Sequence, residues 1–219
     1  MKIGTWNLAG RWSASHRKWL EDLDCDVWLL TEVSERCHVD GYAEHRGTAS
    51  MAPGRNWASV FSRRSLDARP DPDPHPASAA AIIGDTIFVS SILPWRGCGA
   101  VAPWEGPNHA ARTAATVRPL VAAMWRGASV WGGDWNHALS QRETAGSRGG
   151  RKTILDAISE LDLKVPTAAL SHRIDGLLSI DHIAVPNSVN AWNAQRAPAE
   201  VAGKRLSDHD AYVVHVAMT

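Results

Sequence analysis

A chain of 219 residues can form one large α/β domain with a substantial core, and we expect a single domain over residues 1–219. The 23 Lys and Arg residues equal the 23 Asp and Glu residues, which argues against a protein that coats duplex DNA but leaves room for a local basic groove. Three cysteines without a CxxC pair argue against a zinc site or a disulfide framework and favour a reducing, cytoplasmic location. We find no leader segment and no apolar run long enough to span a bilayer, so we expect no membrane anchor.

The chain reads as strands interleaved with a few helices. In its first half the expected elements are a strand at 2–8, a helix capped by Ser13 or Ser15, strands at 26–33 and 56–62, a proline-rich loop at 64–76, and a hairpin of 79–83 with 86–93. In its second half they are a helix from Asn108 to about Trp125 that Pro119 kinks or splits, a short strand from Val130, a glycine-rich loop at 140–150, a helix at 153–161, and strands at 178–185, 189–195 and 211–218. This alternation predicts an α/β or α+β layered domain.

One short segment combines a buried strand with polar residues at its end. It is apolar up to Trp131, has two glycines, and then presents Asp134 and Asn136. In an extended chain, residues two apart point to the same side, so both side chains would face one small volume while Trp135 packs the other way. A carboxylate and an amide there could hold water, a metal ion or a phosphate oxygen. An ordinary turn explains the same residues, because Gly, Asp and Asn are common in turns.

Polar groups also follow the other apolar strands. These groups are Asn7, Glu32, the pair Asp181-His182, and the segment 207–210 before the last strand. Glu32 alone could equally be a surface residue. Carboxylates gathered at one end of a sheet repel each other and lose hydration, and a hard cation such as Mg²⁺ offsets both effects. A histidine beside an acid adds general acid–base capacity.

Five short motifs together resemble a known family. They are Trp6-Asn7, Leu30-Thr31-Glu32, Gly133-Asp134-Trp135-Asn136, Ile180-Asp181-His182 and Ser207-Asp208-His209. In this order and spacing, from residue 5 to residue 210, they resemble the endonuclease/exonuclease/phosphatase superfamily, the group of deoxyribonuclease I, the apurinic endonucleases and the neutral sphingomyelinases. The resemblance implies an α/β fold, a four-layer α/β/β/α sandwich of the deoxyribonuclease I-like type, with one active site at the top of two facing sheets.

The resemblance also implies a metal site. Glu32 would be the main ligand of Mg²⁺, or of Mn²⁺, with Asn7 beside it. Asp208 would help to hold either the metal or the neighbouring histidine.

The catalytic roles follow from the same resemblance. Asp134 would orient or deprotonate the attacking water, and Asn136 would hold a phosphate oxygen or that same water. His209 would contact the scissile phosphate and would be oriented by Asp181. His182 should point away from the site on an alternating strand, which favours a structural role.

These roles predict a Mg-dependent phosphoric ester hydrolase that cleaves a phosphodiester or a phosphomonoester by in-line attack of an activated water. The partner is then a phosphate ester, either a nucleic acid or a small molecule, and we expect a monomer. Asn7, Asn136 and Arg148 are the candidate substrate-binding residues. For Arg148, which lies in the expected glycine-rich loop, an ordinary solvated position is an open alternative.

The sequence departs from the family pattern in two places. Where the family usually has a His or Tyr at the end of its central strand, this chain has Ile92 and Leu93, which cannot bind a phosphate. Trp95, Arg96 and His109 are near enough in sequence to substitute. The second departure is Ala9, where some members have an acidic residue near the metal. The alternative function is therefore a non-catalytic phosphate- or nucleic-acid-binding module that kept the fold.

Overall fold

The computed structural model describes residues 1–124 and 127–218, which form two large β-sheets, one two-stranded sheet and three α-helices. The first sheet has the strand order β11-β14-β1-β2-β5-β3, with β4 also paired to β5. Its strands are β1 (Lys2–Asn7), β2 (Val27–Ser34), β3 (Ala43–Arg46), β4 (Ser50–Ala52), β5 (Arg55–Ser62), β11 (Ala191–Ala197) and β14 (Ala211–Val216). The second sheet has the order β6-β7-β8-β10-β9. Its strands are β6 (Ser78–Ile83), β7 (Thr86–Ser91), β8 (Ala128–Asp134), β9 (Leu163–Lys164) and β10 (Asp181–Pro186).

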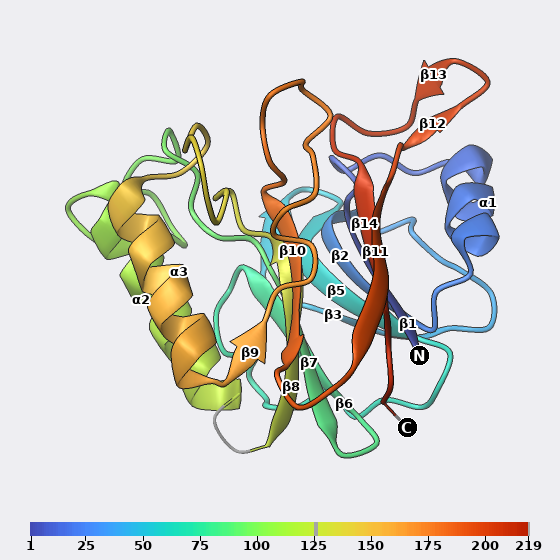
Figure 1. Cartoon of the computed structure of the whole chain (residues 1–219). Helices are drawn as coiled ribbons and strands as arrows, with labels where there is room; N and C mark the ends of the chain where they lie inside the picture. Colours follow the sequence, from blue (N-terminus) through green and yellow to red (C-terminus); the bar gives the residue numbers. More distant parts are fainter. Residues whose placement is uncertain (125–126, 219) are drawn as a thin grey trace.

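The two sheets pack face to face, and helices cover both outer faces (Figure 1). Helix α1 (Ala14–Leu23) covers the first sheet, while α2 (His109–Met124) and α3 (Arg148–Glu160) cover the second. This arrangement confirms the expected α/β/β/α sandwich. A small hairpin of β12 (Glu200–Val201) and β13 (Lys204–Arg205) projects from the loop before β14.

Strand β2 shows why the sequence produces these layers. Leu29 belongs to the core between the sheets, whereas Trp28 and Leu30 point to the outer face and pack in the core beneath α1. Successive side chains of a strand point to opposite faces, so a continuous apolar run is what a sheet covered on both sides requires. Residues 27–31 of β2 are accordingly all buried.

Strand β1 lies in the middle of the first sheet. It pairs in parallel with β2 and antiparallel with β14, so Ile3 has Val27 on one side and Val214 on the other. The first and last strands of the sequence are therefore direct neighbours. The C-terminal ends of β1 and β2 and the loop that precedes β14 therefore lie at the same end of the sheet.

Several elements differ from the expected ones. Helix α2 runs through Pro119 without being split, and its expected end at Trp125 lies outside the described residues. Helix α3 begins at Arg148 and not at residue 153, because Ser147 caps it by accepting a hydrogen bond from the Gly150 N–H (3.1 Å). The expected loop at 140–150 therefore ends three residues earlier, at Ser147. Strands β3 and β4 were not expected at all. None of the helices in the described part of the chain is long and apolar enough to cross a membrane.

Candidate active site

Asp134 and Asp181 face each other across two neighbouring strands. Strand β8 ends at Asp134, and its antiparallel pairing with β10 places Asp181 directly opposite. Both residues are buried, with exposures of 3% and 1%. Two buried carboxylates on directly paired residues repel each other and destabilise the fold unless a positive group lies between them.

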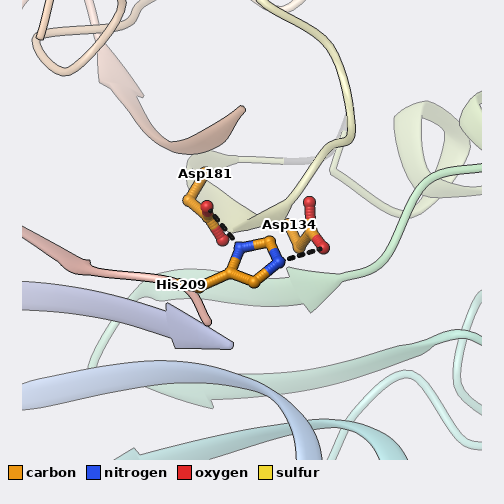
Figure 2. Close-up of side chains that lie close together, drawn as sticks. All are labelled: Asp134, Asp181 and His209. Carbon is orange, nitrogen blue, oxygen red and sulfur yellow. Dashed lines mark hydrogen bonds and ion pairs between the residues drawn. The ribbon is translucent and has the colours of Figure 1, made fainter. Parts of the chain in front are cut away.

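His209 is that positive group. Its Nδ1 lies 2.8 Å from Asp181 Oδ2 and its Nε2 lies 3.9 Å from Asp134 Oδ2, so the ring sits between the two carboxylates (Figure 2). Burial alone would lower the pKa of His209, but the charges of Asp181 and Asp134 and the hydrogen bond to Asp181 outweigh burial and raise this pKa to about 10. The imidazole is therefore protonated at neutral pH. Burial, together with the charge of Asp181, raises the pKa of Asp134 above its usual value.

The loop that carries His209 is fixed against β1. The Ser207 hydroxyl donates to the Asn7 carbonyl (2.6 Å) and accepts from the His209 N–H (3.1 Å). The Trp6 indole N–H donates to the His209 carbonyl (3.2 Å). Since these bonds involve only backbone and buried side chains, the position of His209 does not depend on a bound ligand.

Asn7 connects the acids of the two sheets. Its Nδ2 donates to Asp134 Oδ2 (3.0 Å) and to Glu32 Oε1 (3.1 Å), and its Oδ1 accepts from the Ala9 N–H (2.8 Å). The structure thus brings together Asn7, Glu32 and Asp134, which lie up to 127 positions apart in the sequence. The backbones of Ala9 and Glu32 both have positive φ angles, 50° and 49°, a conformation that costs about 1–3 kcal/mol in a residue other than glycine.

Arg55 is a member of the site that sequence reasoning missed. Its Nη1 lies 2.9 Å from Glu32 Oε2, and its guanidinium covers Gly10, where a Cβ would come within 2.2 Å of the arginine Nε. Arg55 is the first residue of β5, and the antiparallel pairing of β5 with β2 places it opposite Ser34. No local pattern marks Arg55, because only this pairing brings it to Glu32.

Asn136 lies beside Asp134, but not for the reason that the sequence suggested. We expected an extended chain; instead β8 ends at Asp134, and Asn136 has a left-handed backbone with φ 52°. Its N–H donates to Asp134 Oδ1 (3.0 Å), and its Nδ2 donates to the Leu93 carbonyl (3.0 Å). Trp135 packs the other way, against Trp131, as expected. The interpretation of an extended strand through Asn136 is therefore wrong, because the chain turns at this point.

Two predicted site residues lie outside this buried cluster. Asp208 is exposed and lies 3.4 Å from the Ser207 hydroxyl, and its charge adds to the forces that raise the pKa of His209. Arg148 was expected in a loop but is the first residue of α3, where it is exposed. His182 points away from the cluster, as expected, and its Nε2 contacts the His137 carbonyl (2.9 Å).

Ile92 and Leu93, which stand where the family has a His or Tyr, are buried in the apolar cores. His109 does not replace the missing group, because both of its ring nitrogens are already bonded. Its Nδ1 lies 2.8 Å from the Ser147 hydroxyl and its Nε2 lies 2.9 Å from the Pro94 carbonyl.

Of the other two candidates, Trp95 packs against Trp104 in a buried aromatic cluster. The side chain of Arg96 donates only through its Nε, to the Gly146 carbonyl (2.9 Å), among the bonds of the described residues. The two terminal nitrogens of Arg96 therefore have hydrogens left for a ligand.

The donor set fits a hard divalent cation. Ligand atoms of Asp134, Asp181 and His209 all lie within 4.8 Å of one another. The protonated His209 ring is nevertheless a poor ligand, because a metal needs a free nitrogen lone pair. The oxygens of Glu32 and Asp134, connected by Asn7, are better donors. Within the described residues, Asp181 Oδ1 is buried without a hydrogen-bond partner, an unmet acceptor that a cation or a water molecule would satisfy.

The two packed sheets with helices on their outer faces form the deoxyribonuclease I-like fold. This confirms the resemblance at the level of the fold. An AP endonuclease from Archaeoglobus fulgidus matches with a TM-score of 0.71, over 100% of both chains at 16% identity. The 3′ phosphatase NExo from Neisseria, bound to a product DNA hairpin, matches with a TM-score of 0.69, over 98% of both chains at 18% identity. The endonuclease domain of TRAS1, a telomere-specific non-LTR retrotransposon, gives 0.65 over 99% of this chain and 98% of its own at 14% identity. The sequence itself matches no protein-family model and no curated protein.

Proposed function

We propose that this protein is a metal-dependent phosphoric ester hydrolase that cleaves a phosphodiester or phosphomonoester by in-line attack of water. The observation that carries the proposal is the half-buried His209 held between the buried Asp181 and Asp134, beside Glu32 and Asn7. Support comes from the shared fold, because an AP endonuclease and a 3′ phosphatase that acts on DNA are built in the same way.

In this proposal His209 contacts a non-bridging oxygen of the scissile phosphate. Negative charge develops on the phosphoryl oxygens in the transition state, and a fixed cation in a largely buried site stabilises that charge. Asp181 is a positioning residue, because it holds the ring through Nδ1 and leaves Nε2 directed towards Asp134.

Asp134 accepts the proton of the attacking water. Burial raises its pKa, which makes this carboxylate a stronger base than an exposed aspartate. The Asn136 N–H fixes one of its oxygens and the Asn7 amide fixes the other. Asn136 also offers its own side-chain oxygen to the water or to a phosphate oxygen.

Glu32 and Asn7 on the first sheet and Asp134 on the second, with Asp208 at the rim, would hold Mg²⁺ or Mn²⁺. When bound, the cation supplies positive charge to a phosphoryl oxygen and to the leaving group. Arg55 positions the Glu32 carboxylate through its ion pair, so the ligand is already oriented.

The test is hydrolysis of bis-p-nitrophenyl phosphate with Mg²⁺ or Mn²⁺, and with EDTA. We expect activity that EDTA abolishes, and a loss of at least about 100-fold in kcat for Asp134→Asn and His209→Gln, the range of general acid–base and charge-stabilising residues. His215→Gln is the matched histidine control and should keep its activity. His215 lies near the C-terminal end of β14, next to β11, whereas His209 precedes the start of β14. A folded wild type without metal-dependent hydrolysis of any phosphoester would contradict the proposal.

That negative result would favour the alternative, a binding module that kept the fold without turnover. The observation behind this alternative is that Ile92 and Leu93 are buried and leave no His or Tyr at that strand end. Cleavage of plasmid and of single-stranded DNA at low and moderate salt separates a nuclease from a small-molecule phosphatase, because a phosphatase leaves both intact.

The cellular context also remains a proposal. We propose a monomer in the cytoplasm, and the three cysteines, which are all buried and unpaired, are compatible with a reducing compartment. Mass measurement in solution tests the first part, and localisation of a tagged chain tests the second.

A further inference from the structure

A second basic site lies next to the candidate active site. A cavity of about 360 Å³ is lined by four arginines, one glutamate and one glutamine: Arg96, Gln141, Arg142, Glu143, Arg148 and Arg151. We call it the arginine pocket. Four positive charges and one negative charge leave a net charge of +3, whereas the whole chain has a net charge of zero. The basic residues are therefore concentrated locally.

The single acid of the arginine pocket, Glu143, is already bonded to neighbouring groups of the protein. Glu143 Oε2 lies 3.2 Å from Arg151 Nη2, and Glu143 Oε1 accepts from the Gly146 N–H (2.9 Å). Arg151 Nη1 donates to the Gln141 carbonyl (2.9 Å). The Nε of Arg151 is buried and has no partner among the described residues. This pair shapes the wall of the pocket and leaves an unmet donor in it.

The other three arginines keep their charge for a ligand. Arg96 is held by one bond from its Nε, to the Gly146 carbonyl. Arg142 and Arg148 are exposed, and neither forms an ion pair or a side-chain hydrogen bond within residues 1–124 and 127–218. A guanidinium has a planar fork of donors that matches two oxygens of a phosphate.

The start of helix α3 points to the same ligand. The N-terminal end of a helix carries a partial positive charge and has free N–H groups, so cations there are unfavourable and anions are favourable. The first turn of α3 nevertheless contains no acid and begins with Arg148, with Arg151 one turn on. An anion in the arginine pocket would relieve this repulsion.

The arginine pocket adjoins the candidate active site. Leu93 bonds through its N–H to the Asp134 carbonyl and through its carbonyl to Asn136, and Arg96 follows three residues later. Helix α3 begins at the same end of the molecule at which β8 ends (Figure 1). A chain of phosphates whose scissile group lies at His209 therefore has a second positive site beside it.

We propose that the arginine pocket binds a second phosphate of the substrate, so that the protein acts on a molecule with several phosphates in a row, a nucleic acid strand. This inference rests on the proposed hydrolytic function for its catalytic side, but binding can be tested without turnover. The same chemistry would also accept a free inorganic phosphate, and the experiment separates these two sources.

The experiment measures the affinity of a fluorescein-labelled single-stranded oligonucleotide by anisotropy in EDTA, at several salt concentrations. The variant is Arg142→Gln with Arg148→Gln, two exposed and unpaired side chains whose removal leaves the fold intact, which its Tm verifies. The control is Arg17→Gln with Arg118→Gln, which changes the net charge equally at exposed positions on α1 and α2. Each lost phosphate contact lowers the slope of log K against log salt by about 0.7 for a single strand.

We expect the pocket variant to bind at least tenfold more weakly and to lose about 1.4 in slope, while the control keeps both values. Equal affinity and slope in the two variants would overturn the inference. So would a variant that loses only the binding of inorganic phosphate, measured by calorimetry, because the pocket would then hold a free anion. If oligonucleotide binding depends on the pocket but bis-p-nitrophenyl phosphate is not hydrolysed, the proposed function fails and the second phosphate site stands.

Discussion

The charge of His209 makes the stability of the protein depend on pH. The pKa of this histidine is raised in the folded protein to about 10, and its ordinary value is 6.5. A group with a raised folded-state pKa stabilises the fold fully below its unfolded-state pKa, and this contribution is lost as the pH rises through the folded-state pKa. The stabilising contribution of His209 is therefore lost between pH 6.5 and about pH 10.

We expect the difference in unfolding free energy between wild type and His209→Gln to be largest at about pH 6 and to shrink steadily towards about pH 10. Urea unfolding at several pH values across this window, in EDTA, measures it. A difference that stays constant over this range would show that the pKa of His209 is not raised by folding.

The sequence could predict which acids and amides gather, because each follows an apolar strand. Asn7 is hydrogen-bonded to both Glu32 and Asp134, so the three lie together as that pattern suggested. It could not predict Arg55, since the pairing of β2 with β5 decides its position. It also could not predict the left-handed backbone of Asn136, because the strand pattern gives no sign of where β8 ends.

At the scale of elements, β8 depends on its two glycines. Gly133 has φ 126°, and a Cβ on it would lie 2.1 Å from the carbonyl oxygen of Ser91 on β7. Only a residue without a side chain lets β7 and β8 approach this closely while Asp134 points to the site.

We expect Gly133→Ala to lower the unfolding free energy by at least about 2 kcal/mol, from steric overlap added to backbone strain. Gly176→Ala is the control, because Gly176 also has a positive φ (76°), but a Cβ on it would meet no atom of the described residues within 4 Å. Urea titration of both variants gives the comparison. If the two cost the same, the close approach at Gly133 contributes nothing beyond its backbone conformation.

The long strands and helices of the chain were predictable from apolar spacing, and the short ones were not. Strand β3 has the exposed or half-buried sequence AEHR, so no periodicity marks it, and it forms because β5 offers an edge for pairing. The start of α3 was missed because its first residues, Arg148 to Arg151, include two glycines that are poor helix formers. Here the Ser147 cap and packing against α2 outweigh the local propensity.

At the scale of the whole molecule, the candidate metal ligands come from both sheets. Glu32 and Asn7 belong to the first sheet and Asp134 to the second. A cation bound there connects the two halves of the sandwich, so its binding energy adds to the stability of the entire fold.

We therefore expect Mg²⁺ to raise the Tm of the wild type but not that of Glu32→Gln. A concentration about 100-fold above Kd adds about 2.7 kcal/mol to the unfolding free energy. Thermal unfolding with Mg²⁺ and with EDTA measures the effect, and Glu44→Gln on β3 serves as the acidic control. An equal rise in wild type and Glu32→Gln would place the cation elsewhere.

The central position of β1 has a consequence for the newly synthesised chain. This strand receives its second neighbour only when residues 211–216 have left the ribosome, and His209 is made just before them. A nascent chain that stops short of this point has an open strand edge in the middle of its sheet and lacks His209. Under the proposed function, the chain would therefore acquire activity only after synthesis of that last strand.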